Sequence, residues 1–120
     1  PLMKEKWAGA IDSIGSHTLA NVCASIQYGG AVAACGLAQG MDLPATVAPF
    51  ILRGVSLLGV DSVMRPRADR VAAWEKLAEI LPATEMESIA EVISLESSIE
   101  VADKLLKGEV TGRVVVDVNK

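Results

Sequence analysis

Few side chains of this sequence could act in catalysis. Asp12 and His17, the only histidine, lie five positions apart and could serve as an acid and a base. Asp12 ends an apolar run, however, where a carboxylate more often caps a turn or contacts a bound ligand. His17 would open a helix, where a solvated or capping role is the common one. The pair therefore gives no catalytic assignment, and the catalytic residues stay unknown.

The two cysteines, Cys23 and Cys35, are the other candidates for reactivity. A reactive thiolate needs a neighbouring cation or a helix end, and the sequence around Cys35 offers neither. We expect both thiols to be reduced, with Cys23 in a helix and Cys35 a small buried hydrophobe. Together with His17 they supply only three soft ligands, on separate elements, which are too few for a closed zinc site. The sequence therefore predicts no metal.

Two glycine-containing turns are the first places to look for a bound ligand. They follow two apolar runs, residues 9–14 and 30–36, which have the pattern of strands, and a helix is expected over 17–27 between them. Strands that are apolar on both faces and joined by a helix are typical of a parallel sheet. Because ligands bind beyond the carboxyl ends of such strands, we expect a ligand near residues 13–16 and 35–39.

The rest of the chain alternates helices and strands. The expected elements are a short helix over 46–52 with Pro49 in its first turn, a strand over 55–60, an amphipathic helix over 67–81 ended by Pro82, a short strand over 87–93, a helix that follows Ser97, and a strand over 113–118. Phe50, Ile51 and Leu52 would cover one end of the core. Residues 55–60, VSLLGV, carry little charge to protect a sheet edge, which favours pairing with a partner.

Side-chain caps are expected at two helix starts. Ser16 could accept hydrogen bonds from the first amides of the helix over 17–27. Ser97 and Glu100 have the spacing of a capping box at the later helix.

Composition excludes several classes of partner. The 120 residues are 51% hydrophobic, which is enough to bury a substantial core at the size of one domain. The net charge of -4 argues against nucleic acid, which is bound through neutralisation of its phosphates. No apolar run approaches the ~20 residues of a membrane span, and there is no secretory leader pattern. We expect a soluble protein of the cytoplasm.

The order of these motifs resembles a known family. The segments AIDSIG, GGAVAACGLAQG, LPATVAPFILRGVSLLGVDS and GEVTGRVVVDV are similar to the C-terminal part of the medium-chain dehydrogenases/reductases, nearest to the quinone-oxidoreductase-like branch that includes NADPH-dependent acrylyl-CoA reductases. The resemblance covers essentially the whole chain. It implies an α/β fold: the second half of a Rossmann-type parallel sheet with flanking helices, and a C-terminal segment that returns to the catalytic domain.

The resemblance also implies which residues line the cofactor. In relatives, the backbone beyond these strands contacts the nicotinamide and its ribose, which corresponds here to Ser13, Ile14, Gly15, Cys35, Gly36, Leu37, Gly59, Val60 and Asp61. Arg113 resembles a position that contacts the pyrophosphate, and this role is favoured over the alternative that an arginine before a final strand faces water or pairs with a carboxylate. The implied cofactor is NADPH, and no zinc is expected in this branch.

The implied activity is that of a longer enzyme. Residues 1–61 would be the later half of the cofactor domain, and residues 62–120 would pack back towards a catalytic domain that lies upstream. Such an enzyme transfers hydride to an activated carbon-carbon double bond of an acyl-CoA thioester or an enone, and it forms a homodimer through the 55–60 edge. By itself the 120-residue chain is expected to be inactive. The alternative is a non-catalytic nucleotide-binding or dimerisation module.

Overall fold

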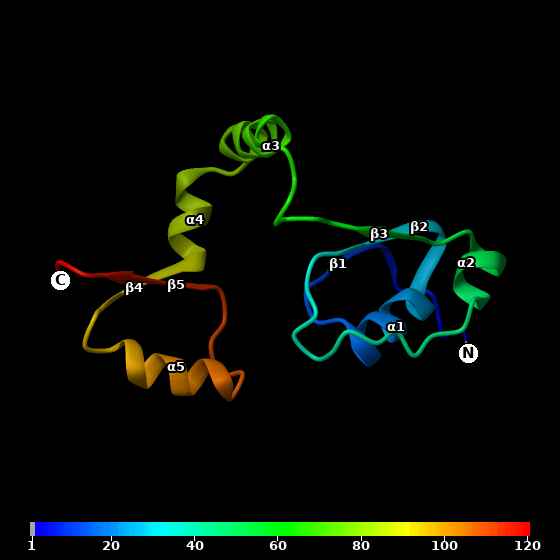
Figure 1. Ribbon diagram of the computed structural model, residues 1–120, viewed down its shortest axis with the longest axis horizontal. Coiled ribbons are helices and arrows are strands. Elements are labelled where there is room, and N and C mark those ends of the chain that lie inside the picture. The colour runs from blue at the N-terminus through cyan, green and yellow to red at the C-terminus, as the bar shows by residue number, and fades with distance from the viewer. Residues whose placement is uncertain (1) are drawn as a thin grey trace. The chain divides into compact units, whose positions relative to one another are not determined.

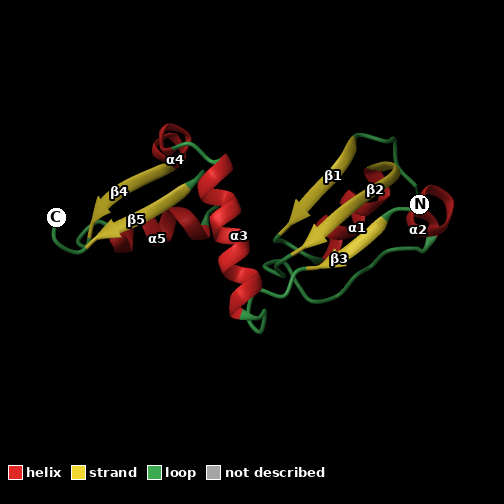
Figure 2. Cartoon of the chain, turned by 90° about the horizontal axis from the view of Figure 1, so that it is seen from above, coloured by secondary structure: helices red, strands yellow, loops and turns green. Residues whose placement is uncertain are grey.

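Parallel strands joined by helices build both parts of the chain. The computed structural model describes residues 2–120, which divide into two compact units between Arg65 and Pro66 (Figure 1). The first unit contains β1 (Trp7–Asp12), α1 (Ser16–Ser25), β2 (Ile26–Ala34), α2 (Ala48–Arg53) and β3 (Ser56–Gly59). Its three strands are parallel, in the order β1-β2-β3 (Figure 2). The expected α/β class with a parallel sheet and flanking helices is confirmed.

The core of the first unit lies between the sheet and its helices. α1 packs against β1 and β2, and α2 packs against β2. The side chains that meet there are Leu19, Cys23, Ile26, Val32 and Val55. Phe50 of α2 packs against this cluster, and Pro49 occupies the first turn of α2 as expected. Ile51 and Leu52 are 72% and 64% exposed, so the expectation that they cover the core is wrong: of the apolar residues 49–52, the short helix turns Pro49 and Phe50 inward.

Strands β1 and β2 begin and end earlier than the hydrophobic pattern predicts. β1 ends at Asp12, because the Asp12 carboxylate closes a turn by accepting a hydrogen bond from the amide of Gly15. β2 begins at Ile26, directly after α1, although the helix was expected to run to Gln27 and the strand to begin at Gly30. Between the pairs Trp7–Ile26 and Gly9–Ala31, β2 contains more residues than β1, so the register shifts at a bulge. Gly29, within this bulge, has a φ of 72°.

A side chain from elsewhere caps the start of α1. Gly15 is the N-cap residue and no local side chain caps the helix, so the expected role of Ser16 is wrong. Instead, Gln39 Oε1 accepts hydrogen bonds from the amide and the hydroxyl of Thr18, each at 3.1 Å. The capping group therefore comes from the loop that follows β2.

The second unit contains a smaller parallel sheet. Its elements are α3 (Arg67–Ile80), α4 (Ala83–Ile89), β4 (Ala90–Ser94), α5 (Ser98–Leu106) and β5 (Arg113–Asp117). β4 and β5 pair in parallel, from Ala90 opposite Arg113 to Ser94 opposite Asp117. The expected strand over 87–93 is wrong in its first half, since α4 runs to Ile89. Pro82 ends α3 as expected, but its carbonyl also begins α4 by accepting from the amides of Glu85 and Met86.

The expected capping box of α5 is absent. The hydroxyls of Ser97 and Ser94 lie 3.2 Å apart and bond to each other, and no side chain caps the helix. The Glu100 carboxylate pairs with Lys104 one turn later at 2.7 Å, which lowers the pKa of Glu100 and raises that of Lys104. The side chains of the box therefore find other partners.

Candidate functional site

The turns that follow β2 and β3 enclose an open hollow. Its volume is about 480 Å³, and it lies where the carboxyl ends of two neighbouring parallel strands meet. Its lining residues are Ala34, Cys35, Gly36, Leu37, Gly59, Val60, Asp61, Ser62 and Val63. Six of the residues expected to contact a cofactor, those at 35–37 and 59–61, thus come together in one place.

The turn after β1 is joined to the turn after β2 by main-chain contacts. The amide of Cys35 donates to the carbonyl of Asp12 at 2.8 Å, and the amide of Gln39 donates to that of Ile14 at 2.7 Å. Gly36 lies so close that a Cβ atom there would stand 2.5 Å from the oxygen of Ser13. Residues 13–15 are therefore neighbours of the hollow, although they do not line it.

Asp12 caps the turn that it precedes. Its side chain is buried, and its Oδ2 atom accepts from the amide of Gly15 at 2.8 Å. Of the two roles expected for Asp12, the turn-capping one is the one the structure shows.

Burial raises the pKa of the Cys23 thiol, and the Asp12 charge raises it further. Cys23 is accordingly an unreactive core residue, as expected.

Cys35 departs from its expected place. It was predicted to be buried, but it is exposed at the hollow, because β2 ends at Ala34, two residues before the predicted end of the strand. Its Sγ atom donates to the carbonyl oxygen of Asp12 at 3.3 Å. His17 is also exposed, on the first turn of α1, which agrees with a solvated residue.

The hollow offers peptide groups and little charge. Among the described residues, the amides of Gly36 and Leu37 donate to no protein acceptor. Gly59 leaves open space, since nothing lies within 4 Å of a Cβ atom placed there. Asp61 is the only charged side chain of the lining, and no lysine or arginine belongs to it. Such a wall can bind uncharged polar groups through the main chain, but it has no cation to offer a phosphate.

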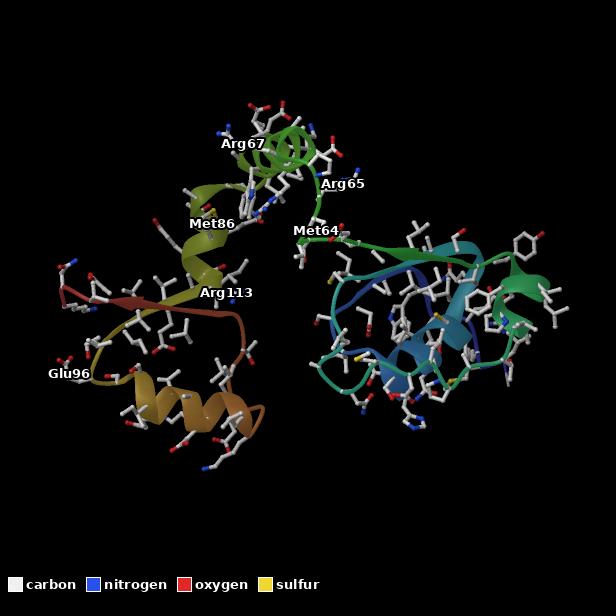
Figure 3. All side chains as sticks on the ribbon, in the orientation of Figure 1. Met64, Arg65, Arg67, Met86, Glu96 and Arg113 are labelled. Atoms are coloured by element: carbon white, nitrogen blue, oxygen red, sulfur yellow. The ribbon has the colours of Figure 1, made fainter. Side chains whose placement is uncertain are left out.

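Arg113 belongs to the second unit. It is exposed at the first position of β5, and its side chain borders a separate apolar pocket of about 370 Å³ (Figure 3). The other residues of that pocket are Trp74, Leu77, Ala78, Leu81, Met86, Ile89 and Ala90. No ion pair of Arg113 occurs among residues 2–120.

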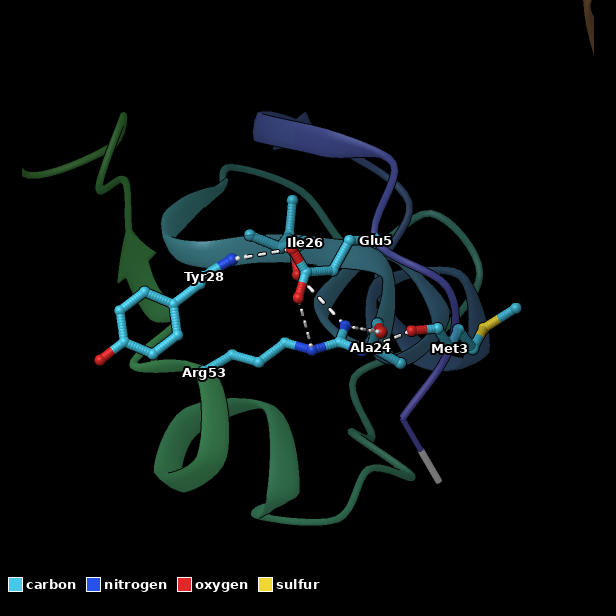
Figure 4. A network of polar contacts seen from close by, with 6 residues as sticks. All are labelled: Met3, Glu5, Ala24, Ile26, Tyr28 and Arg53. Carbon is cyan, nitrogen blue, oxygen red and sulfur yellow. Dashed lines mark hydrogen bonds and ion pairs between the residues drawn. The ribbon is translucent and has the colours of Figure 1, made fainter.

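Arg53 is an organising residue that the sequence analysis missed. Its guanidinium donates to the carbonyls of Ala24 and Ile26 at 2.9 and 3.3 Å, and to that of Met3 at 2.6 Å (Figure 4). It also pairs with Glu5 at 3.3 Å. Arg53 thus holds the C-terminal end of α1 from a different helix. A basic residue in the last turn of a helix was visible in the sequence, but it suggests a bond to its own helix.

Neither clustered metal ligands nor a membrane-spanning helix occurs among residues 2–120. Over residues 2–120, no three histidine, cysteine, aspartate or glutamate side chains are grouped as metal ligands would be. In the same range, no helix combines the length and apolar character that crossing a membrane requires.

Known proteins similar to the chain are oxidoreductases. An acrylyl-CoA reductase of Ruegeria pomeroyi is 51% identical over 119 residues, which is 99% of this chain and 36% of that protein. A quinone oxidoreductase assigned in Bacillus subtilis is 45% identical over 116 residues, which is 96% of this chain and 35% of that protein. The structure of a Salmonella enterica oxidoreductase in complex with NADP superposes with a TM-score of 0.86 at 50% identity, and the match covers 98% of this chain and 36% of the other.

These similarities define the class of protein. No protein-family model matches the chain, but its fold and its relatives show that it is similar to part of the medium-chain dehydrogenases/reductases. Within that superfamily, its similarity is to acrylyl-CoA reductases and a quinone oxidoreductase. The chain spans about a third of the length of these relatives.

Proposed function

We propose that the chain forms part of an NADPH-dependent reductase, in which the hollow beyond β2 and β3 holds the nicotinamide end of the cofactor. The substrate would be a compound with an activated carbon-carbon double bond, such as an acrylyl thioester. The observation that carries the proposal is the position of the hollow at the carboxyl ends of parallel strands, in a chain that is about half identical to acrylyl-CoA reductases.

The groups of the hollow fit the nicotinamide end of such a cofactor. The free amides of Gly36 and Leu37 can donate to a carboxamide or a ribose, and Gly59 leaves room for a ring against the backbone. When bound, the cofactor supplies the hydride. The residues of the chain would bind and orient the ring and exclude water from one side of it. Residues 13–15 would support this wall through their contacts with the next turn.

The hollow contains no cation, so we propose that the phosphates are held elsewhere. We assign the pyrophosphate to Arg113, whose planar guanidinium suits that group. The 2'-phosphate and the groups that stabilise the developing enolate would belong to further parts of a longer protein. Its relatives are almost three times as long as this chain, which supports that division.

The second unit supports a longer protein for a different reason. Ile93 is the only hydrophobic residue among residues 66–120 that is buried, while Trp74, Met86 and Ile89 are half or more exposed. So little buried apolar surface cannot offset the entropy of ordering this many residues. We propose that residues 62–120 complete their core against a catalytic domain, and that residues 1–61 belong to the cofactor domain.

The test is turnover by the full-length protein. We expect NADPH to be oxidised rapidly in the presence of acryloyl-CoA, and the isolated 120-residue chain to show no turnover. Absorbance at the NADPH band reports the reaction directly. A control with NADH measures the preference for the phosphorylated cofactor. Good activity on a quinone or an enone, with none on acryloyl-CoA, would exclude an acyl thioester as the substrate. NADPH binding without turnover of acryloyl-CoA, a quinone or an enone would favour the non-catalytic nucleotide-binding module.

We also propose that the full-length protein is a homodimer paired through β3. Val60 donates to Ala34 of β2, so alternation along the strand directs the amide of Leu57 to the free edge. Leu57→Pro should remove an edge donor and weaken association by at least tenfold, whereas Leu57→Ala loses similar packing but keeps the donor. Sedimentation of both folded variants compares them. Equal association of the two would exclude this edge as the interface.

A further inference from the structure

One wall of the hollow is a loop that a single carboxylate holds in place. After β3, the chain turns through residues 61–64, and Asp61, Ser62 and Val63 all border the hollow. The Asp61 Oδ1 atom accepts from the amides of Val63 and Met64, each at 2.9 Å. No other hydrogen bond involves residues 62–64 in the described part of the chain. The shape of this wall therefore depends on one side chain.

The hydrogen bonds to the loop amides keep the Asp61 carboxylate ionised. The two amide hydrogen bonds, from Met64 and Val63, lower the pKa of Asp61, and the charge of Arg65 lowers it slightly further. The side chain is thus ionised throughout the neutral range. All four loop residues are exposed, so packing does not replace the hydrogen bonds if they are lost (Figure 3 labels Met64 at the end of the loop).

We infer that Asp61 is a positioning residue: its carboxylate folds residues 61–64 so that Ser62 and Val63 form the outer wall of the cofactor hollow. The inference rests on the proposed function and adds a role to it. Under the family resemblance Asp61 contacts the cofactor as part of the wall, whereas here its side chain acts on the loop amides. The groups presented to the ligand are then the backbone and the side chains of Ser62 and Val63.

Two substitutions separate this role from a direct effect of charge. Asp61→Asn keeps an oxygen that can accept from both amides but removes the charge, and Asp61→Ala removes the acceptor. In the full-length protein, we expect Asp61→Ala to raise the Kd and the KM for NADPH about tenfold, as the loss of two hydrogen bonds implies, with kcat changed much less. Asp61→Asn should stay within about threefold of the wild type.

A second measurement follows the loop itself. Hydrogen exchange of the Val63 and Met64 amides should accelerate in Asp61→Ala and remain close to wild type in Asp61→Asn. Asp117→Ala is the matched control, since Asp117 Oδ1 accepts from the amide of Asn119 at 2.9 Å in a similar turn outside the hollow. That control should leave NADPH affinity unchanged.

The outcomes are distinct. If Asp61→Asn weakens NADPH binding as much as Asp61→Ala does, the charge acts on the ligand and the positioning role is wrong. If Asp61→Ala binds like wild type, the loop is not needed and the inference also fails. Absence of NADPH binding by the wild type would instead remove the proposed function, and unchanged exchange of the two amides in Asp61→Ala would remove the loop anchor independently of any ligand.

Discussion

Gly15→Ala is expected to destabilise the full-length protein by about 3 kcal/mol and to weaken NADPH binding by more than tenfold. Gly15 has φ 76° and ψ -163°, a combination that essentially only glycine adopts. A Cβ atom there would also stand 2.6 Å from the carbonyl oxygen of Gly40. Any relief must move the turn that connects Asp12 to α1, and with it the backbone that supports the hollow.

A substitution at a second glycine separates the effect of backbone strain from the effect of the close contact with Gly40. Gly54 has a left-handed backbone, with φ 58° and ψ 29°, but nothing lies within 4 Å of a Cβ atom placed there. Gly54→Ala should therefore cost only the conformational strain, about 1 kcal/mol, and leave NADPH affinity unchanged. Thermal unfolding and cofactor titration measure both variants. Equal losses of stability would mean that the close approach of Gly15 to Gly40 contributes nothing.

Arg53→Met is expected to cost about 3 kcal/mol of unfolding free energy, since each lost hydrogen bond from a charged donor contributes roughly 1 kcal/mol or more. The substitution removes the guanidinium donor from the carbonyls of Met3, Ala24 and Ile26 and the cationic partner from Glu5. The Ala24 carbonyl still accepts from the amide of Met3, and Glu5 still accepts from the amide of Tyr28. Arg53→Lys should recover less than half of the loss, because an ammonium group cannot span the separate acceptors that the guanidinium fork reaches.

An exposed ion pair provides the control for Arg53. Lys76 and Glu79 pair at 2.6 Å on α3, where both side chains are about two-thirds exposed. Lys76→Met should change the unfolding free energy by less than about 0.5 kcal/mol. Urea denaturation of all three variants makes the comparison. Full recovery by Arg53→Lys would show that the charge, and not the geometry of the fork, stabilises this end of α1.

The parallel architecture was predictable because its signals are local. Runs such as those before Asp12 and before Cys35 are apolar on both faces, and a parallel strand pair requires a crossover between them, so the fold class followed from composition and order. The hollow was predictable for the same reason: the carboxyl ends of parallel strands meet at one edge. The family resemblance then supplied the expected chemistry.

The errors arose where distant groups decide a boundary. α1 ends at Ser25 because Arg53 and the N-terminal segment take the last carbonyls, and neither is near in sequence. Its start is capped by Gln39 and not by Ser16. Cys35 is exposed because β2 ends at Ala34, before the end of the apolar run. The side-chain partners at the two ends of α1 are 21 and 29 residues away, beyond what a hydrophobic pattern records.

The joined turns after β1 and β2 bear on how this enzyme class could diverge. Their contacts run between backbone atoms, from Cys35 to Asp12 and from Gln39 to Ile14. The exposed side chains of Ile14 and Leu37 can therefore mutate without altering the peptide groups that hold the turns together. If the proposed function holds, selection on substrate range can act on these exposed side chains while the main-chain support of the hollow is inherited unchanged.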